Sequence, residues 1–137
     1  MESEKRILIV EPNQEIAKKL YQVFLKERYV VNVTERASEA IRNIQQEHVS
    51  VLILDVGVKD MAWNEVVPII KGFAPTLPII MTSDLNTPEL EASILHHKAF
   101  YYHVKSFGVD ELLLAVRNAV EKPVTNIQKF PRQEEAP

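Results

Sequence analysis

The sequence predicts an α/β fold in which a five-stranded parallel sheet carries helices on both faces. Short apolar runs rich in β-branched and aromatic residues recur along the chain, and longer stretches with helical spacing separate them. Four runs end abruptly at polar residues, namely Glu11, Asp55, the pair Thr82-Ser83, and Lys105. Because parallel strands point the same way, we expect these side chains to meet at the carboxyl edge of the sheet, where open α/β folds place their ligands.

Length and charge narrow the class of protein. A chain of 137 residues fits one domain, which we expect over 5–122, with tails at 1–4 and 123–137, the second a tail or linker stub. The absence of cysteine excludes disulfides and thiolate metal sites. The net charge of -3 argues against a broad nucleic-acid or anionic-lipid surface, and the first apolar run is too short for a membrane span. We therefore expect a cytoplasmic protein with no direct nucleic-acid or membrane contact.

Five strands are expected to alternate with five helices. The strands are the apolar runs, over residues 7–10, 29–33, 51–54, 77–81 and 100–104. Asn13 is a good N-cap for a first helix of about 15 residues. A second helix follows from the apolar spacing over 37–44.

The remaining three helices are predicted from their end signals and apolar faces. Asn64 is expected to cap the third helix, with Pro68 in its first turn. Thr87, followed by a proline and an acid, predicts the start of the fourth helix. The last helix is predicted from its apolar face between Leu112 and Val120. We expect none of the sequence given after Val120 to fold into a DNA-binding unit, whether the chain is a single-domain regulator or part of a longer protein.

The polar residues at the strand ends suit phosphoryl chemistry. Asp55 is a candidate nucleophile and cation anchor, and Glu11 a second cation ligand. Ser83 is a candidate donor to a phosphoryl oxygen, and Lys105 a candidate charge partner for another. Since Thr82 precedes Ser83 directly, a shift of one residue in strand register exchanges their faces, and that choice stays open.

Residues 5–122 resemble the receiver domain of bacterial two-component response regulators. The resemblance rests on four stretches in the right order, which are Ile7 to Glu11, Val51 to Asp55, Pro78 to Ser83, and Ala99 to Lys105 followed by Phe107. It implies a doubly wound, flavodoxin-like sheet with strand order 2-1-3-4-5.

The resemblance also implies roles. Asp55 corresponds to the phosphoacceptor, Ser83 to the switch hydroxyl, Tyr102 to the switch aromatic and Lys105 to the phosphate-pairing lysine. Glu11, Asp55 and the backbone carbonyl of Gly57 correspond to Mg2+ ligands.

The implied function is phosphorelay signalling. A sensor histidine kinase or phosphotransfer protein donates the phosphoryl group. A downstream protein then binds the face formed by the fourth helix, fifth strand and fifth helix. We expect Tyr101 and His103 to be exposed on this face, which also suits a homodimer. The domain is not an enzyme beyond its own phosphorylation and dephosphorylation. A haloacid-dehalogenase-like phosphatase needs a second aspartate where Gly57 stands, and no glycine-rich turn for a dinucleotide follows the first strand.

The acidic pocket departs from the receiver pattern. Receivers carry two adjacent acids after the first strand, whereas this chain has Glu11-Pro12. Proline supplies no ligand, so Mg2+ binding is expected to be possible but weakened. Lys59 replaces a usual proline and is a candidate stand-in for the cation, while Asp84 is expected near the mouth of the pocket. The alternative is therefore a degenerate pseudo-receiver that binds proteins without phosphorylation.

Overall fold

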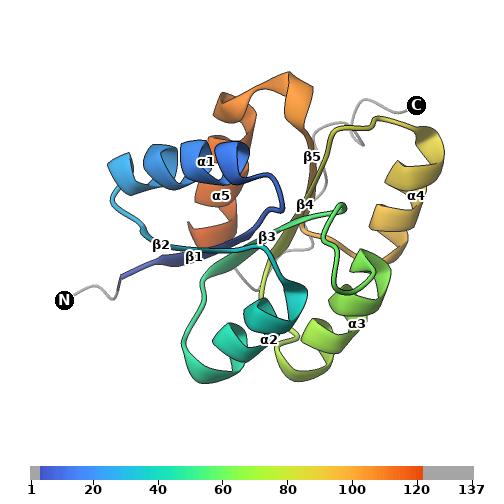
Figure 1. The fold of residues 1–137 in the computed structure, drawn as a ribbon, viewed down its shortest axis with the longest axis horizontal. Helices are drawn as coiled ribbons and strands as arrows, with labels where there is room; N and C mark the ends of the chain where they lie inside the picture. The colour runs from blue at the N-terminus through green and yellow to red at the C-terminus, as the bar shows by residue number, and fades with distance from the viewer. Residues whose placement is uncertain (1–3, 122–137) are drawn as a thin grey trace.

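A computed structural model describes residues 4–121 and confirms the predicted architecture. Five parallel strands form one sheet in the order β2-β1-β3-β4-β5 (Figure 1). The strands are β1 Arg6–Val10, β2 Val30–Thr34, β3 Val51–Asp55, β4 Ile79–Ser83 and β5 Tyr101–Val104. The helices are α1 Gln14–Lys26, α2 Ala37–Gln46, α3 Trp63–Phe73, α4 Pro88–His96 and α5 Val109–Glu121, with a short 3-10 helix at Lys105–Phe107. The proposed tail at 123–137 lies outside the described residues.

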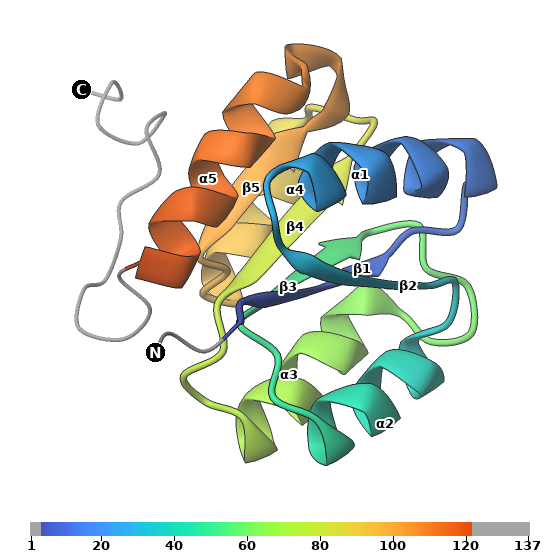
Figure 2. The same cartoon turned by 90° about the vertical axis from the view of Figure 1, so that its left-hand side faces the viewer.

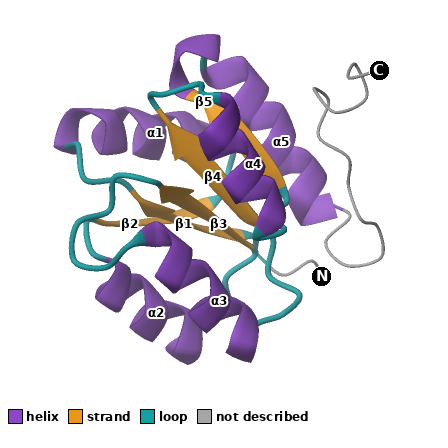
Figure 3. Ribbon diagram, turned by 90° about the vertical axis from the view of Figure 1, so that its right-hand side faces the viewer, coloured by secondary structure: helices purple, strands orange, loops and turns teal. Residues whose placement is uncertain are grey.

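Helices cover both faces of the sheet. Figure 2 shows α1 and α5 together on one face and α2 and α3 on the other, and Figure 3 shows α4 beside β4 and β5. Every residue of β3 and β4 is buried, as expected for central parallel strands covered on both sides. Between residues 4 and 121 no helix has the length and apolar character to cross a membrane.

Two predicted helix starts are confirmed. The Asn13 side chain accepts hydrogen bonds from the backbone N–H groups of Glu15 and Ile16 at 3.0 and 3.1 Å. Thr87 caps α4 by accepting from the N–H of Leu90, and Pro88 occupies the first turn. Each cap satisfies N–H groups that the helix itself leaves unpaired.

The predicted start of α3 is wrong. The helix begins at Trp63 with Ala62 as N-cap, without a side-chain cap, so Pro68 lies beyond the first turn. Proline has no N–H to donate to the carbonyl of Asn64, one turn earlier. Because both residues are exposed, water can serve that carbonyl.

The amino end of α2 is capped from a distant loop. Its N-cap residue, Arg36, makes no side-chain capping bond. Instead, the N–H groups of Ala37 and Ser38 donate to the two carboxylate oxygens of Asp60 at 2.8 and 3.0 Å. Burial acts against the charged carboxyl, but these hydrogen bonds outweigh it and lower the pKa of Asp60 below 3.8. The loop that follows β3 is therefore tied to α2.

Strands β3 and β4 continue past their apolar runs. Asp55 is the last residue of β3, and β4 includes Thr82 and Ser83. Parallel pairing uses backbone groups, so polar residues extend the ladder as readily as apolar ones. The register places Asp55 opposite Thr82, and the N–H of Val56 donates to the Thr82 carbonyl at 3.0 Å.

Candidate functional site

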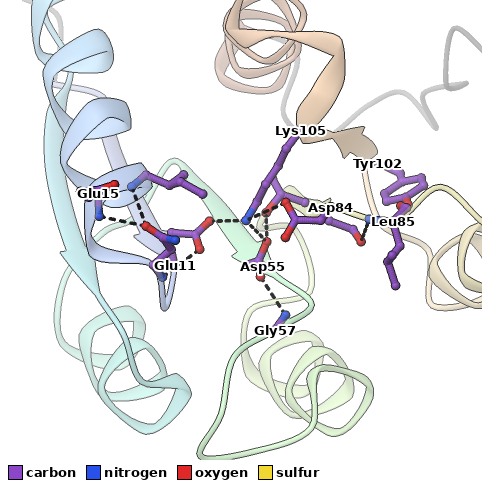
Figure 4. A network of polar contacts seen from close by, with 12 residues as sticks. Glu11, Glu15, Asp55, Gly57, Asp84, Leu85, Tyr102 and Lys105 are labelled. Carbon is purple, nitrogen blue, oxygen red and sulfur yellow. Dashed lines mark hydrogen bonds and ion pairs between the residues drawn. The ribbon is translucent and has the colours of Figure 1, made fainter.

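Polar side chains from four segments converge at the carboxyl edge of the sheet (Figure 4). The Lys105 ammonium lies 2.8 Å from Glu11 Oε1 and 2.8 Å from Asp55 Oδ1. Asp55 also accepts a hydrogen bond from the Thr82 hydroxyl at 2.8 Å. The convergence predicted from the strand directions is thus present.

Donors engage both oxygens of the Asp55 carboxylate. Thr82 and Lys105 donate to Oδ1, and the backbone N–H of Gly57 donates to Oδ2 at 2.8 Å. The residue is only 5% exposed. A Cβ atom at Gly57 would lie 2.9 Å from Oδ2, so a larger residue there would displace the carboxylate. These contacts fix the orientation of Asp55.

Glu11 shares the ammonium with Asp55. Its Oε2 accepts from the N–H of Asn13 at 3.1 Å, and its side chain is 2% exposed. Burial raises the pKa of Glu11, with the contact to Lys105 acting in the opposite direction. Burial works against the Lys105 ammonium, but its hydrogen bonds to Asp55 and Glu11 outweigh that effect and raise its pKa above 10.5. The site is a buried carboxylate pair around one ammonium group.

Thr82, rather than Ser83, lies against the Asp55 carboxylate, and the role of Ser83 as the switch hydroxyl stays a prediction. Successive side chains of a strand leave opposite faces of the sheet, and the register aligns Thr82 with Asp55. Ser83 is fully buried on the other face, where its Oγ accepts from the N–H of Leu85 at 2.9 Å. The sequence signal for Thr82 was that two adjacent residues with hydroxyl groups end a strand predicted to lie beside Asp55.

Ser83 and Tyr102 both contact the backbone of Leu85. The fully buried Tyr102 donates its hydroxyl to the Leu85 carbonyl at 2.5 Å, while Ser83 accepts from the Leu85 N–H. The Leu85 side chain is 61% exposed. Both expected switch side chains therefore hold the loop between β4 and α4 at Leu85. Figure 4 shows Tyr102 beside that residue.

The two unusual charges near the pocket have different positions. The Asp84 carboxylate is 4.0 Å from the Lys105 ammonium and 79% exposed, so it lies at the mouth of the site as expected. Lys59 is exposed, and the ion pairs of Asp55 in the described chain involve Lys105 instead. The hypothesis that Lys59 replaces the cation is not supported by this geometry.

The predicted exposed face of β5 is wrong. Tyr101 and His103 are 5% and 3% exposed, because helices cover both faces of this edge strand. His103 instead contacts α5, with its Nδ1 3.0 Å from Glu111 Oε1. A homodimer through this side would depend on the helices rather than on these two side chains.

The site presents two buried carboxylates as candidate metal ligands, those of Glu11 and Asp55. Within residues 4–121 no three His, Cys, Asp or Glu side chains are grouped to hold a metal ion. Pro12 contributes a ring that lies 3.8 Å from the Cβ position of Gly57, beside Asp55. Glu11 and Asp55 supply the carboxylates here, and the Lys105 ammonium lies against both.

Known proteins share this sequence pattern. The family model of the response regulator receiver domain matches residues 7–117. The DNA-binding transcriptional regulator NtrC of Proteus hauseri is 25% identical over 114 residues, which cover 83% of this chain and 24% of NtrC. The chain thus spans about a quarter of the length of that relative.

Solved structures share this fold, and the matches cover most of the length of both chains. A CheY-like response regulator receiver domain protein from Methanospirillum hungatei JF-1 matches with a TM-score of 0.82 at 25% identity, over 88% of this chain and 97% of that one. The response regulator TrrA from Thermotoga maritima, solved in complex with Mg(2+)-BeF, matches with a TM-score of 0.74 at 27% identity, over 83% and 97%. The chain belongs to the response regulator receiver domain family.

Proposed function

We propose that Asp55 accepts a phosphoryl group and that the domain works in a phosphorelay. The observation that carries the proposal is the contact between Asp55 Oδ1 and the Lys105 ammonium at 2.8 Å, at the carboxyl edge of the sheet. A carboxylate is a competent nucleophile toward phosphorus, and a fixed ammonium offsets the charge that the phosphoryl group brings. Receiver domains are signalling modules, and this site has the parts of one.

The proposed step is a displacement at phosphorus. An oxygen of Asp55 forms a bond to phosphorus as the bond from phosphorus to the donor breaks, and the donor atom leaves with that electron pair. The donor is a phosphohistidine of a sensor kinase or phosphotransfer protein, or a small acyl phosphate. The product is a mixed anhydride on Asp55 with added negative charge. Lys105 stays paired with that charge, while the Gly57 N–H holds the carboxyl group in orientation.

Mg2+ is expected to bind this pocket weakly. The TrrA structure contains Mg(2+)-BeF, so the metal belongs to the chemistry of a related receiver. In this chain the residue after Glu11 is proline, and each carboxylate already contacts Lys105 and a backbone N–H. Since Mg2+ demands near-octahedral oxygen ligands, these residues do not fit a tightly held ion. The displacement above is therefore assigned to the side chains of the protein alone.

The response to phosphorylation is expected at Leu85. A phosphoryl group on Asp55 offers oxygens that attract a nearby hydroxyl donor. If Ser83 turns toward it, the bond from the Leu85 N–H to Ser83 Oγ is lost, and the Tyr102 contact with the same residue is disturbed. We propose that the exposed Leu85 side chain and the adjoining α4, β5 and α5 then change their affinity for a downstream protein or a second copy of the domain.

A phosphodonor experiment tests the proposal directly. The protein is incubated with acetyl phosphate with and without Mg2+, and its intact mass is measured. We expect one phosphoryl addition, which is lost in Asp55→Asn and removed by hydroxylamine. Asp110→Asn, which changes an exposed acid in the first turn of α5, is the matched control and should be modified like the wild type. No addition under either condition would leave the domain as a protein-binding module without phosphorylation.

A further inference from the structure

Buried polar side chains continue from Asp55 across the sheet toward α5. The register pairs Asp55 with Thr82, and Thr82 with His103. Partners in register leave a parallel sheet on the same face, so the three side chains form a row across β3, β4 and β5. Their exposed fractions are 5%, 2% and 3%. Burying three polar groups in line is costly unless each has a partner, which indicates a specific arrangement.

Contacts are present at both ends of this row. The Thr82 hydroxyl donates to Asp55 Oδ1 at 2.8 Å. His103 Nδ1 lies 3.0 Å from Glu111 Oε1 on α5, and the side chains of this pair are 4% and 33% exposed. The Glu111 carboxylate is therefore the acidic group that lies against the buried His103 ring.

A cavity adjoins the row on the face covered by α1 and α5. Its volume is about 240 Å³, and Thr82, His103 and Lys105 contribute its polar lining. The other lining residues from α1 and α5 are mainly apolar, apart from Lys19. The charged groups on the cavity side of His103 include Glu111 on α5, Lys19 on α1 and Lys105 after β5, and the titratable Tyr101 lies two residues before it on the same strand.

We propose that Thr82 and His103 are positioning residues for the phosphoacceptor: Thr82 fixes the Asp55 carboxyl, and a proton on His103 favours the phosphorylated form. The proposal rests on the function proposed above for Asp55. A proton on His103 neutralises the Glu111 carboxylate, so the interior behind Asp55 becomes less negative and better suited to an added phosphoryl charge. Removing that proton reverses the effect.

The proposed coupling is reciprocal. If a proton on His103 favours negative charge at position 55, then negative charge at position 55 must favour the proton on His103. Two strand spacings separate Asp55 from His103, about 10 Å. At an effective dielectric near 20, one charge at about this distance moves the midpoint of a titration by about one pH unit, and less in salt.

An NMR titration tests the row without any phosphodonor. The ring nitrogen shifts of His103 are followed against pH in the wild type, in Asp55→Asn and in Asp110→Asn. We expect the His103 midpoint to fall by about half a unit or more in Asp55→Asn and to change much less in the Asp110→Asn control. An unchanged midpoint in Asp55→Asn would overturn the proposal, whether or not Asp55 is ever phosphorylated.

Thr82 variants test the other half. Thr82→Val preserves shape and removes the hydroxyl, and Thr82→Ser restores it. We expect the rate of modification by acetyl phosphate to fall about tenfold in Thr82→Val and to recover in Thr82→Ser, because a hydrogen bond to a charged group is lost and regained. The rate of modification of the wild type should depend on pH through the proton on His103. In His103→Gln that part of the pH dependence should be absent. Equal rates in the wild type and Thr82→Val would refute the role of Thr82. A wild type that takes no phosphoryl group would refute the proposed function instead, and the His103 titration would still decide the coupling.

Discussion

Replacing Lys105 with methionine should destabilise the fold, because two buried acids lose the one ammonium group that they share. The Lys105 ammonium lies 2.8 Å from both Glu11 Oε1 and Asp55 Oδ1, and the two acidic side chains are 2% and 7% exposed. Removing one partner of a buried ion pair costs about 3–5 kcal/mol. Because the Lys105 side chain is 17% exposed, we expect the lower end of this range, about 3 kcal/mol. That is a large fraction of the stability of a typical domain.

Urea unfolding at about pH 7, followed by far-ultraviolet circular dichroism, measures this loss. Lys59→Met is the matched control, because Lys59 is exposed, and its free energy of unfolding should stay within about 0.5 kcal/mol of the wild type. Two carboxylates roughly 5 Å apart repel by about 3 kcal/mol at an effective dielectric of 20. The double variant Lys105→Met with Asp55→Asn should therefore recover a measurable part of the loss.

Lowering the pH should reduce the stability deficit of the Lys105→Met variant. Burial already raises the pKa of Glu11, and Lys105 opposes that rise, so its removal raises the pKa further. A raised pKa means that the folded state holds the proton more tightly than the unfolded state, so relative stability increases as pH falls through the folded value. The deficit should shrink between about pH 7 and pH 5. A deficit that is the same at both pH values, or a Lys105→Met protein as stable as the wild type, would contradict this account of the pocket.

Three further outcomes follow from the hydrogen bonds and pKa shifts. Asp60→Ala should lower the free energy of unfolding by about 0.5–2 kcal/mol and speed amide exchange at Ala37, because α2 loses its cap, whereas Asp60→Asn should lose less stability. In the wild type the contribution of Asp60 to stability is lost as pH falls through its lowered pKa, and urea midpoints measured across the acid range follow that loss. Tyr102→Phe should cost about 1 kcal/mol and increase amide exchange at Leu85, since the bond to its carbonyl is lost. Because the pKa of Lys105 is raised above 10.5, its contribution to folding stability is complete below that value and is lost as pH rises through the folded pKa. The urea midpoint of the wild type should therefore fall in strong alkali, and that of Lys105→Met should fall less.

The pattern of residues along the chain was enough to predict the order of the elements and the edge of the sheet where the site lies. Alternating apolar runs and helical stretches specify parallel strands joined by crossovers, and parallel strands bring their carboxyl ends together. Asp55 and Lys105 could be placed together on this ground, and they are. The helix N-caps at Asn13 and Thr87 could also be predicted from the sequence, because each depends on a few consecutive residues. The start of α3 was not, since no polar side chain marks it.

Which side chains face one another depends on the folded arrangement and could not be predicted from the residue pattern. Thr82 and Ser83 are neighbours in sequence, but the backbone pairing of β3 with β4 turns one toward Asp55 and the other away. The contact between His103 and Glu111 depends on how α5 lies over β5. Local periodicity specifies each strand and helix separately. It does not contain the register between strands distant in the chain, and a difference of one residue in that register exchanges the two faces.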